Sequence, residues 1–334
     1  MPFYMNKLRL GVLGCSGHYA LRVAAPLKIS KIVEPYALAS RDIAKANEFI
    51  KTYHFSKTYG SYEALLDDPD VDFVYIPLPN NLHLEYIKKA ADAGKPVICE
   101  KPVCLNAAEA KEAAEYCQKK SVLLMEAFMY RFHPQWVCAK EIVLNGEIGD
   151  LLSFNCHFSY MNRDADNIRN KPETGGGAIY DIGCYAVSTA RFLFDREPVR
   201  AICTLIRDKR FKTDITTSGI LDFCEGRTST FTVSTQMCPH QRITAFGTKG
   251  SLSIEIPFNM PPNISGKITV SNSAGERVIE SEIADQYLLQ FEAFAESVIK
   301  KTGAPTPVSD AIANMSVLDA LFKSAKTNSW VKIN

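Results

Sequence analysis

Three side chains able to move a proton lie in two separate segments of the sequence. Lys101 stands in residues 97–102 (VICEKP), and Asp181 and Tyr185 stand in residues 175–185 (GGGAIYDIGCY). In a helix, Asp181 and Tyr185 would be one turn apart on one face. The tyrosine pKa of about 10 is too high for a base at neutral pH, but a nearby ammonium group such as that of Lys101 lowers it. Together the three residues predict a proton relay of the kind that hydride transfer needs, although each alone also fits a structural role.

A glycine-containing turn lies near the start of the chain, in residues 10–20 (LGVLGCSGHYA). Glycines at a strand-to-helix turn let the backbone approach a pyrophosphate, which binds to the free N–H groups at the helix N-terminus. Strict GxGxxG is absent: the spacing is Gly14-x-x-Gly17-x-x-Ala20, with Ser16 at the position expected for a second glycine. A plain tight turn is the alternative, but the preceding strand and the five β/α units that follow favour a dinucleotide site.

The end of the second predicted strand, residues 38–42 (LASRD), bears on the choice of cofactor. An NAD site places a carboxylate there, against the ribose 2′-hydroxyl. Ser40 and Arg41 instead suit a 2′-phosphate, because a guanidinium is planar and always charged. We therefore predict NADP(H). The alternative is NAD bound through Asp42, a residue that could also cap the next helix or pair with Arg41.

The first third of the chain alternates short apolar runs with helical patterns, as a parallel sheet with crossover helices requires. Two predicted strands end in segments that should lie beyond the carboxyl ends of the sheet, where ligands bind in such folds. These segments are residues 77–81 (PLPNN) and residues 100–102, where the proline disfavours helix at Lys101. The elements expected are strands at 8–13, 36–39, 71–76, 97–99 and 123–126, and helices from residue 19 and at 43–53, 62–66, 82–93 and 107–119.

After residues 146–149 (GEIG) the pattern changes to alternating, strand-like segments. Strands are expected at 151–158, 199–206, 218–223, 228–235, 242–246 and 251–256, with a helical insertion at 175–194 and late helices at 286–300 and 308–325. We therefore predict an α/β protein with a Rossmann domain, a doubly wound parallel sheet, in residues 1–126. Residues 127–334 should form an α+β domain with a large, mostly antiparallel open sheet, for substrate binding and oligomerisation. Whether the C-terminal helix packs back on the first domain is left open.

Composition excludes several other classes of protein. The 334 residues carry 38 basic and 37 acidic side chains, a net charge of +1, so nucleic acid and membrane surfaces are not expected partners. Ten cysteines are scattered through hydrophobic segments without CxxC or Cys/His zinc spacing, which predicts buried reduced thiols and no metal site. Residues 1–10 lack the apolar core of a signal peptide, and we expect a cytoplasmic protein.

Four motifs taken together resemble those of the Gfo/Idh/MocA oxidoreductase family. They are the turn at 11–20, the Glu100-Lys101-Pro102 motif, residues 126–134 (EAFMYRFHP) and residues 175–185, in an order and spacing that span nearly the whole chain. The sequence is most similar to the branch containing glucose-fructose oxidoreductase, dimeric dihydrodiol dehydrogenase and NADP-dependent D-xylose dehydrogenases. That branch has tyrosine where many relatives have histidine, and Tyr185 fills this position.

The resemblance implies that Lys101 and Tyr185 form the catalytic pair with Asp181 as support, and that hydride passes between the nicotinamide and a sugar carbon. It also implies substrate contacts from Arg131, His133 and Arg169, with a structural role for His133 as the alternative. We expect an NADP(H)-dependent sugar dehydrogenase that oxidises an aldose such as D-xylose at C1 to the lactone. The residues expected to contact the cofactor are Gly14, Cys15, Ser16, Gly17, His18, Tyr19, Ser40, Arg41, Pro77, Leu78, Asn80, His83, Glu100 and Lys101.

Other functions fit the same residues. Reduction of a keto-sugar or oxidation of a trans-dihydrodiol needs the same relay. A non-catalytic NADP-binding redox sensor is an alternative of another class, although such a protein would be expected to lose Lys101, Asp181 or Tyr185. The Thr- and Ser-rich alternation of residues 228–235 (TSTFTVST) suggests a sheet face that pairs with a second copy in a homodimer or homotetramer.

Overall fold

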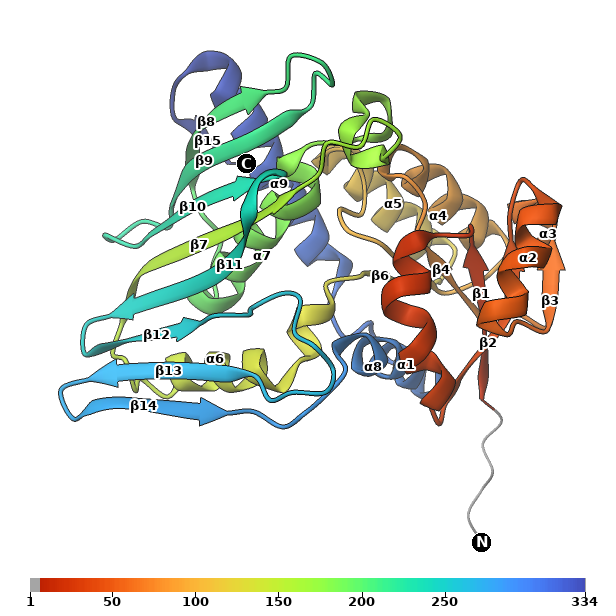
Figure 1. Ribbon diagram of the computed structural model, residues 1–334, viewed down its shortest axis with the longest axis horizontal. Coiled ribbons are helices and arrows are strands. Elements are labelled where there is room, and N and C mark those ends of the chain that lie inside the picture. Colours follow the sequence, from red (N-terminus) through yellow and green to blue (C-terminus); the bar gives the residue numbers. More distant parts are fainter. Residues whose placement is uncertain (1–6, 334) are drawn as a thin grey trace, which may run out of the picture. The chain divides into compact units, whose positions relative to one another are not determined.

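The computed structural model describes residues 7–333, so most of the segment that carries the expectation about a signal peptide lies outside the described residues. The chain divides into two compact units, whose elements are labelled in Figure 1. The first unit comprises the chain up to Met129 together with Tyr287–Ile312. The second comprises Tyr130–Gln286 and the chain from Ala313 onward.

The first unit is built on a parallel sheet. Within the described residues its strands lie in the order β3-β2-β1-β4-β5-β6, and every neighbouring pair is parallel. This order confirms the predicted doubly wound Rossmann sheet, with its switch point between β1 and β4. The strands are β1 (Leu8–Leu13), β2 (Val33–Ala39), β3 (Lys57–Tyr59), β4 (Phe73–Ile76), β5 (Val97–Cys99) and β6 (Leu124–Glu126).

Helices cover this sheet, and the central strands are therefore apolar throughout. All four residues of β4 are fully buried, as is typical of a parallel strand covered on both faces. Helix α8 (Gln286–Lys300) joins this unit because Phe291 and Phe294 pack against Tyr75 and Phe73 of β4, with ring centroids 5.1 and 5.8 Å apart. The other helices are η1 (Tyr19–Val23, a π-helix), α1 (Ala24–Ile29), α2 (Ile43–Tyr53), α3 (Tyr62–Leu66), η2 (Asn80–Leu82), α4 (His83–Asp92) and α5 (Ala107–Lys119).

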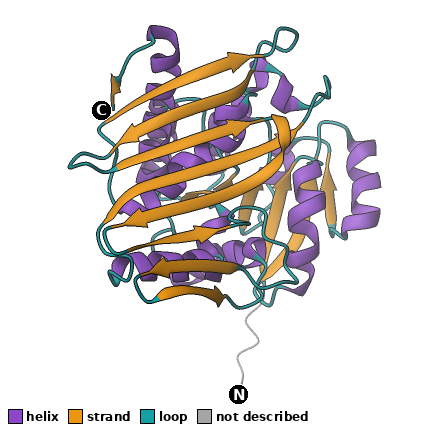
Figure 2. Cartoon of the chain, turned by 60° about the vertical axis from the view of Figure 1, so that its left-hand side comes forward, coloured by secondary structure: helices purple, strands orange, loops and turns teal. Residues whose placement is uncertain are grey.

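The second unit contains a large mixed sheet. Across residues 7–333 its strands follow the order β14-β13-β12-β11-β7-β10-β9-β8-β15, and only the β7/β10 pair is parallel. This arrangement confirms the predicted, mostly antiparallel open sheet. Figure 2 shows one broad face of the sheet without a covering helix. The strands are β7 (Leu151–Met161), β8 (Arg200–Arg207), β9 (Asp214–Asp222), β10 (Thr228–Ser234), β11 (Gln236–Gly247), β12 (Gly250–Ile254), β13 (Lys267–Asn272), β14 (Gly275–Glu280) and β15 (Val331–Lys332).

The helical insertion of this unit differs from one continuous α-helix. Residues Ile179–Gly183 form a π-helix, η6, which leads directly into α7 (Cys184–Phe194). The remaining helices are η3 (Met129–Phe132), α6 (Pro134–Leu144), η4 (Ile168–Asn170), η5 (Pro172–Thr174) and α9 (Val308–Thr327). The first residue of η3 and the residues of α9 up to Ile312 belong to the first unit. Between residues 7 and 333 we find no helix both long and apolar enough to cross a membrane.

Several expectations from the sequence need correction. Strands β3, β13, β14 and β15 were not predicted, and β9 begins at Asp214 rather than Ser218. Strand β14 is exposed along most of its length, so it lacks the alternating apolar pattern that identifies a strand. The cysteines are not all buried, because Cys224 and Cys238 are exposed.

Candidate active site

The glycine turn joins β1 to η1 and leaves its backbone open. Gly14 has a φ of +108°, which a side chain rarely allows, and its N–H donates to the carbonyl of Ala39. A methyl group added to Gly17 would meet nothing within 4 Å, so no side chain or backbone crowds this position. Within the turn, the Ser16 hydroxyl accepts from the His18 N–H at 3.1 Å. A glycine turn between a strand and a helix is where a pyrophosphate binds in Rossmann folds, and the prediction for these residues stays a prediction.

The choice between NADP and NAD was predicted from Ser40, Arg41 and Asp42 at the end of β2. Asp42 caps α2, and its carboxylate accepts from the N–H groups of Ala44 and Lys45 at 2.9 and 3.1 Å. Ser40 is buried, and its hydroxyl accepts from the Asp42 N–H. In the described residues Arg41 forms no ion pair with Asp42. Burial raises the pKa of Tyr62, and the hydrogen-bonded Arg41 guanidinium partly offsets this rise.

Cys15 stands beside this segment. Burial raises the pKa of its thiol, and a hydrogen bond with the Ser40 hydroxyl opposes that rise. The thiol is therefore neutral and inert rather than a reactive thiolate.

Glu100, at the end of β5, holds a buried network in the first unit. Its Oε1 accepts from the Tyr75 hydroxyl at 2.6 Å and lies 3.4 Å from Nε2 of His18, while Oε2 accepts from the Lys101 N–H at 3.3 Å. Burial raises the pKa of Glu100, but His18, Lys101 and Tyr75 outweigh it and hold the value at about 2. An anionic carboxylate thus links the glycine turn to the segment that carries Lys101.

The side chains of His83 and Tyr19, both predicted to contact the cofactor, are fully buried. The ring nitrogens of His83 lie 2.9 Å from the carbonyl oxygens of Pro102 and Leu78, so the side chain ties two loops together. The ring of Tyr19 packs among aromatic residues, with centroids 5.4 Å from Phe55. Of the segment after β4, Leu78 is buried, whereas Pro77 and Asn80 are half-buried at the sheet edge.

Asp181 and Tyr185 lie in the second unit and both face strand β7. Asp181 accepts hydrogen bonds from the Tyr160 hydroxyl and from Nε of Arg169, the latter at 2.9 Å. Tyr185 is 5% exposed, and its ring packs against those of Phe158 and Phe258, with centroids 5.9 and 5.1 Å apart. Because alternate residues of a strand point to one face, Phe158 and Tyr160 bring Tyr185 and Asp181 to the same side of β7.

Arg131 and His133 have different surroundings. Arg131 donates to the hydroxyls of Ser188 and Tyr130, at 2.9 and 3.3 Å, and Ser188 follows Tyr185 by one turn of α7. His133 is fully buried and caps α6, where its Nδ1 accepts from the Gln135 N–H. Burial lowers the pKa of His133 to about 4. This geometry favours the structural alternative for His133 over substrate contact.

Sequence reasoning did not single out Tyr160, Ser188 or Tyr130. Tyr160 lies two residues beyond Phe158, near the end of a predicted strand, so the strand alternation could have placed it on the core face. Ser188 and Tyr130 gave no such signal, because their roles depend on a pairing between distant segments.

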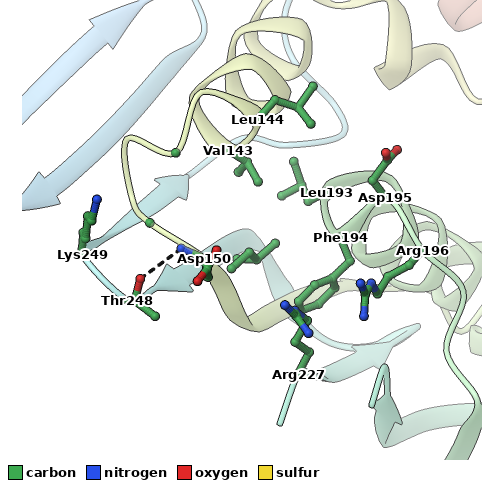
Figure 3. A pocket seen from close by; sticks show the side chains of 13 residues that line it. Val143, Leu144, Asp150, Leu193, Phe194, Asp195, Arg196, Arg227, Thr248 and Lys249 are labelled. Carbon is green, nitrogen blue, oxygen red and sulfur yellow. Dashed lines mark hydrogen bonds between the residues drawn. The ribbon is translucent and has the colours of Figure 1, made fainter. Parts of the chain in front are cut away.

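The second unit also contains a separate pocket of about 390 Å³. Figure 3 shows its apolar wall of Leu193 and Phe194 beside charged side chains. The guanidinium of Arg196 pairs with Glu225 at 3.2 Å, and Asp195 pairs with Lys140 at 2.9 Å, so these charges are already neutralised. Its lining includes none of the predicted site residues. The lining residues are Val143, Leu144, Gly146, Gly149, Asp150, Leu151, Leu193, Phe194, Asp195, Arg196, Arg227, Thr248 and Lys249.

The sheet order and the glycine turn define a Rossmann fold of the dinucleotide-binding class. Residues 8–128 match the oxidoreductase family with an NAD-binding Rossmann fold, and residues 136–253 match the GFO/IDH/MocA C-terminal domain. The chain is 37% identical over 331 residues to a D-xylose 1-dehydrogenase (NADP(+)) from Haloferax volcanii, covering 98% of this chain and 100% of the relative. The chain belongs to the Gfo/Idh/MocA oxidoreductase family, which confirms the resemblance.

Two further similarities lie within the same family. A trans-1,2-dihydrobenzene-1,2-diol dehydrogenase from Xenopus laevis is 34% identical over 219 residues, covering 65% of this chain and 66% of the relative. The crystal structure of a 3-ketoreductase from Actinomadura kijaniata, in complex with NADP and TDP-benzene, superposes with a TM-score of 0.91. That structure is 27% identical, and the match covers 96% of this chain and 98% of the other.

Proposed function

We propose that the protein is an NADP(H)-dependent oxidoreductase that oxidises the C1 hydroxyl of an aldose, with D-xylose as the first candidate, to the lactone. The observation that carries this proposal is the similarity, along almost the whole chain, to a D-xylose 1-dehydrogenase that uses NADP(+). The Tyr160–Asp181–Arg169 cluster beside Tyr185 supports it, because these polar groups suit a substrate with several hydroxyls.

NADP(H) is the cofactor that the first unit fits. The N–H groups at Gly17 would hold the pyrophosphate, and Arg41 has no carboxylate partner in an ion pair within residues 7–333, so it is available for a 2′-phosphate. Asp42 caps α2, with Oδ1 accepting both of the capping bonds. A bound nicotinamide supplies the acceptor for the hydride that leaves the sugar carbon.

The proton chemistry belongs to side chains of this chain. Tyr185 takes the proton from the C1 hydroxyl as the C1–H bond breaks and the carbonyl forms. Lys101 is the second member of the proposed catalytic pair. Asp181 and Arg169 bind and orient sugar hydroxyls, and Arg131 contributes a further substrate contact.

Reduction of a nucleotide-linked keto-sugar is the second candidate, favoured by the TM-score of 0.91 to a 3-ketoreductase solved with TDP-benzene. In that reaction the same groups act in reverse, with Tyr185 donating the proton. Oxidation of a trans-dihydrodiol is the third candidate, favoured by the match to the Xenopus dehydrogenase.

A substrate panel tests the proposal. Aldoses, trans-dihydrodiols and keto-sugars are incubated with NADP(H) and separately with NAD(H), and the absorbance of the reduced nicotinamide is followed. Aldose oxidation with NADP⁺ is the expected result. Turnover confined to keto-sugars or dihydrodiols would make that class the substrate in place of an aldose. Turnover with NAD⁺ alone would overturn the assignment of Ser40 and Arg41 to the 2′-phosphate.

A further inference from the structure

Asp214, the first residue of β9, is a buried carboxylate with no cation as its direct partner. Its exposed fraction is 1%, and within the described chain no basic side chain forms an ion pair with it. Backbone groups bind it instead, since the N–H of Ile179 donates to Oδ2 at 2.7 Å. Ile179 begins the π-helix that carries Asp181, so Asp214 caps this helix from a distant strand.

The glycine run before this helix makes room for Asp214 and for the Arg169 backbone. A methyl group on Gly177 would lie 2.0 Å from Oδ1 of Asp214, and its φ of +123° already favours glycine. A methyl group on Gly176 would lie 2.5 Å from the carbonyl oxygen of Arg169. These two glycines therefore serve close packing inside the second unit.

Gly177 joins the segments that carry Arg169 and Asp181. Its N–H donates to the carbonyl of Arg169 at 2.9 Å, and its carbonyl accepts from the Asp181 N–H at 3.0 Å. The side chains of those two residues form the ion pair described above. A carboxylate packed on Gly177 thus fixes the backbone on both sides of that ion pair.

Burying the charge of Asp214 costs free energy, and a neutral cap at this position would cost less. Burial raises the pKa of Asp214, and the backbone N–H groups of Ile179 and Ala178 together with Arg207 offset part of that rise. Serine or asparagine caps a helix as well without burying a charge. An anion at a helix N-terminus, however, interacts favourably with the helix dipole and holds the first turn more firmly.

From this geometry we infer that Asp214 is a positioning residue: through Gly177 and Ile179 it sets the Arg169–Asp181 pair for the substrate. The inference rests on the proposed function, in which that pair orients the sugar. It predicts that loss of the carboxylate affects the chemistry with the sugar and leaves the cofactor site of the first unit intact.

The test compares Asp214→Asn with Asp222→Asn, the same substitution at the other end of β9, where the aspartate pairs with Arg200 near the surface. NADPH binding, followed by its fluorescence, counts the folded sites in each preparation. We expect Asp214→Asn to lower kcat and kcat/KM for the sugar per binding site by about 10- to 100-fold, with an unchanged KM for NADP⁺. Asp222→Asn should remain within about twofold of the wild type.

A second variant keeps the test decisive if Asp214→Asn does not fold. Gly177→Ala leaves the carboxylate in place and displaces the backbone that connects the segments of Arg169 and Asp181. It should therefore lower kcat per site in the same way. Asp214→Ser frees space for the methyl group added at Gly177. The loss of kcat in the double variant should therefore be less than additive. If the variant that folds has the same kcat per site as the wild type, the inference is overturned. Asp214 would then act only as a helix cap that stabilises the fold. Full turnover in Tyr185→Phe would instead overturn the proposed function itself.

Discussion

The Tyr160 hydroxyl donates a hydrogen bond to Asp181, so the end of β7 is tied to the π-helix that precedes Tyr185. Burial and the Asp181 charge raise the pKa of Tyr160, which keeps it a donor across neutral and mildly alkaline pH. Tyr160→Phe should therefore lower kcat/KM for the sugar by about tenfold, the value of one hydrogen bond, equally from pH 6 to pH 9. Tyr116→Phe, which removes an exposed tyrosine–aspartate bond, is the control. An unchanged kcat/KM in Tyr160→Phe would contradict this role.

Arg41 should select the 2′-phosphate. Replacing Arg41 by alanine removes a charge-assisted contact, so affinity for 2′,5′-ADP should fall by about 10- to 100-fold while affinity for 5′-AMP stays constant. Isothermal titration with these two nucleotides needs no substrate. Lys51→Ala, an exposed position in the last turn of the following helix α2, serves as the matched control. An equal loss of affinity for both nucleotides would show that Arg41 does not recognise the 2′-phosphate.

Glu100 should make the stability of the cofactor-free enzyme depend on acid pH. Its pKa of about 2 in the fold lies below the ordinary glutamate value of 4.5. Its stabilisation, up to about 3 kcal/mol, is therefore complete above pH 4.5 and is lost as the pH falls toward 2. Glu100→Gln should lower the free energy of unfolding in urea at pH 7, and the difference from wild type should shrink by pH 3.

The control for this titration is Glu115→Gln, an exposed glutamate on α5. Its difference from the wild type should be small at both pH values. A difference between wild type and Glu100→Gln that stays constant from pH 7 to pH 3 would contradict the depressed pKa.

The open face of the large sheet should bind a second copy of the chain. Along β10 the residues Thr228, Thr230 and Thr232 are half-buried and alternate with buried neighbours, so they point to the face of the sheet opposite those neighbours. Sedimentation velocity should show a dimer or tetramer, and Thr230→Arg should shift it toward the monomer because a buried unpaired charge is costly. Glu115→Arg on α5 should leave the oligomer intact. A wild-type monomer at micromolar concentration would contradict this prediction.

The sequence predicted the parts of the fold that local pattern controls. Helices α5 and α8 and strand β1 have the predicted bounds, because apolar periodicity and end signals coincide there. Asp42 illustrates the limit: its position fitted a ribose ligand, a helix cap or an ion pair, and only the geometry shows the cap. Asp214 gave no functional signal, because its partner Ile179 lies in a distant segment that tertiary packing alone brings to it.

The measurement that tests the account most directly is the turnover of Tyr185→Phe with NADP⁺ and the best aldose of the panel, per NADPH-binding site. The substitution removes one hydroxyl and keeps the ring that packs on Phe158 and Phe258. If Tyr185 takes the substrate proton, kcat should fall by about 10²- to 10⁴-fold while NADPH still binds with the wild-type affinity. Wild-type turnover in this variant would contradict the proposed mechanism.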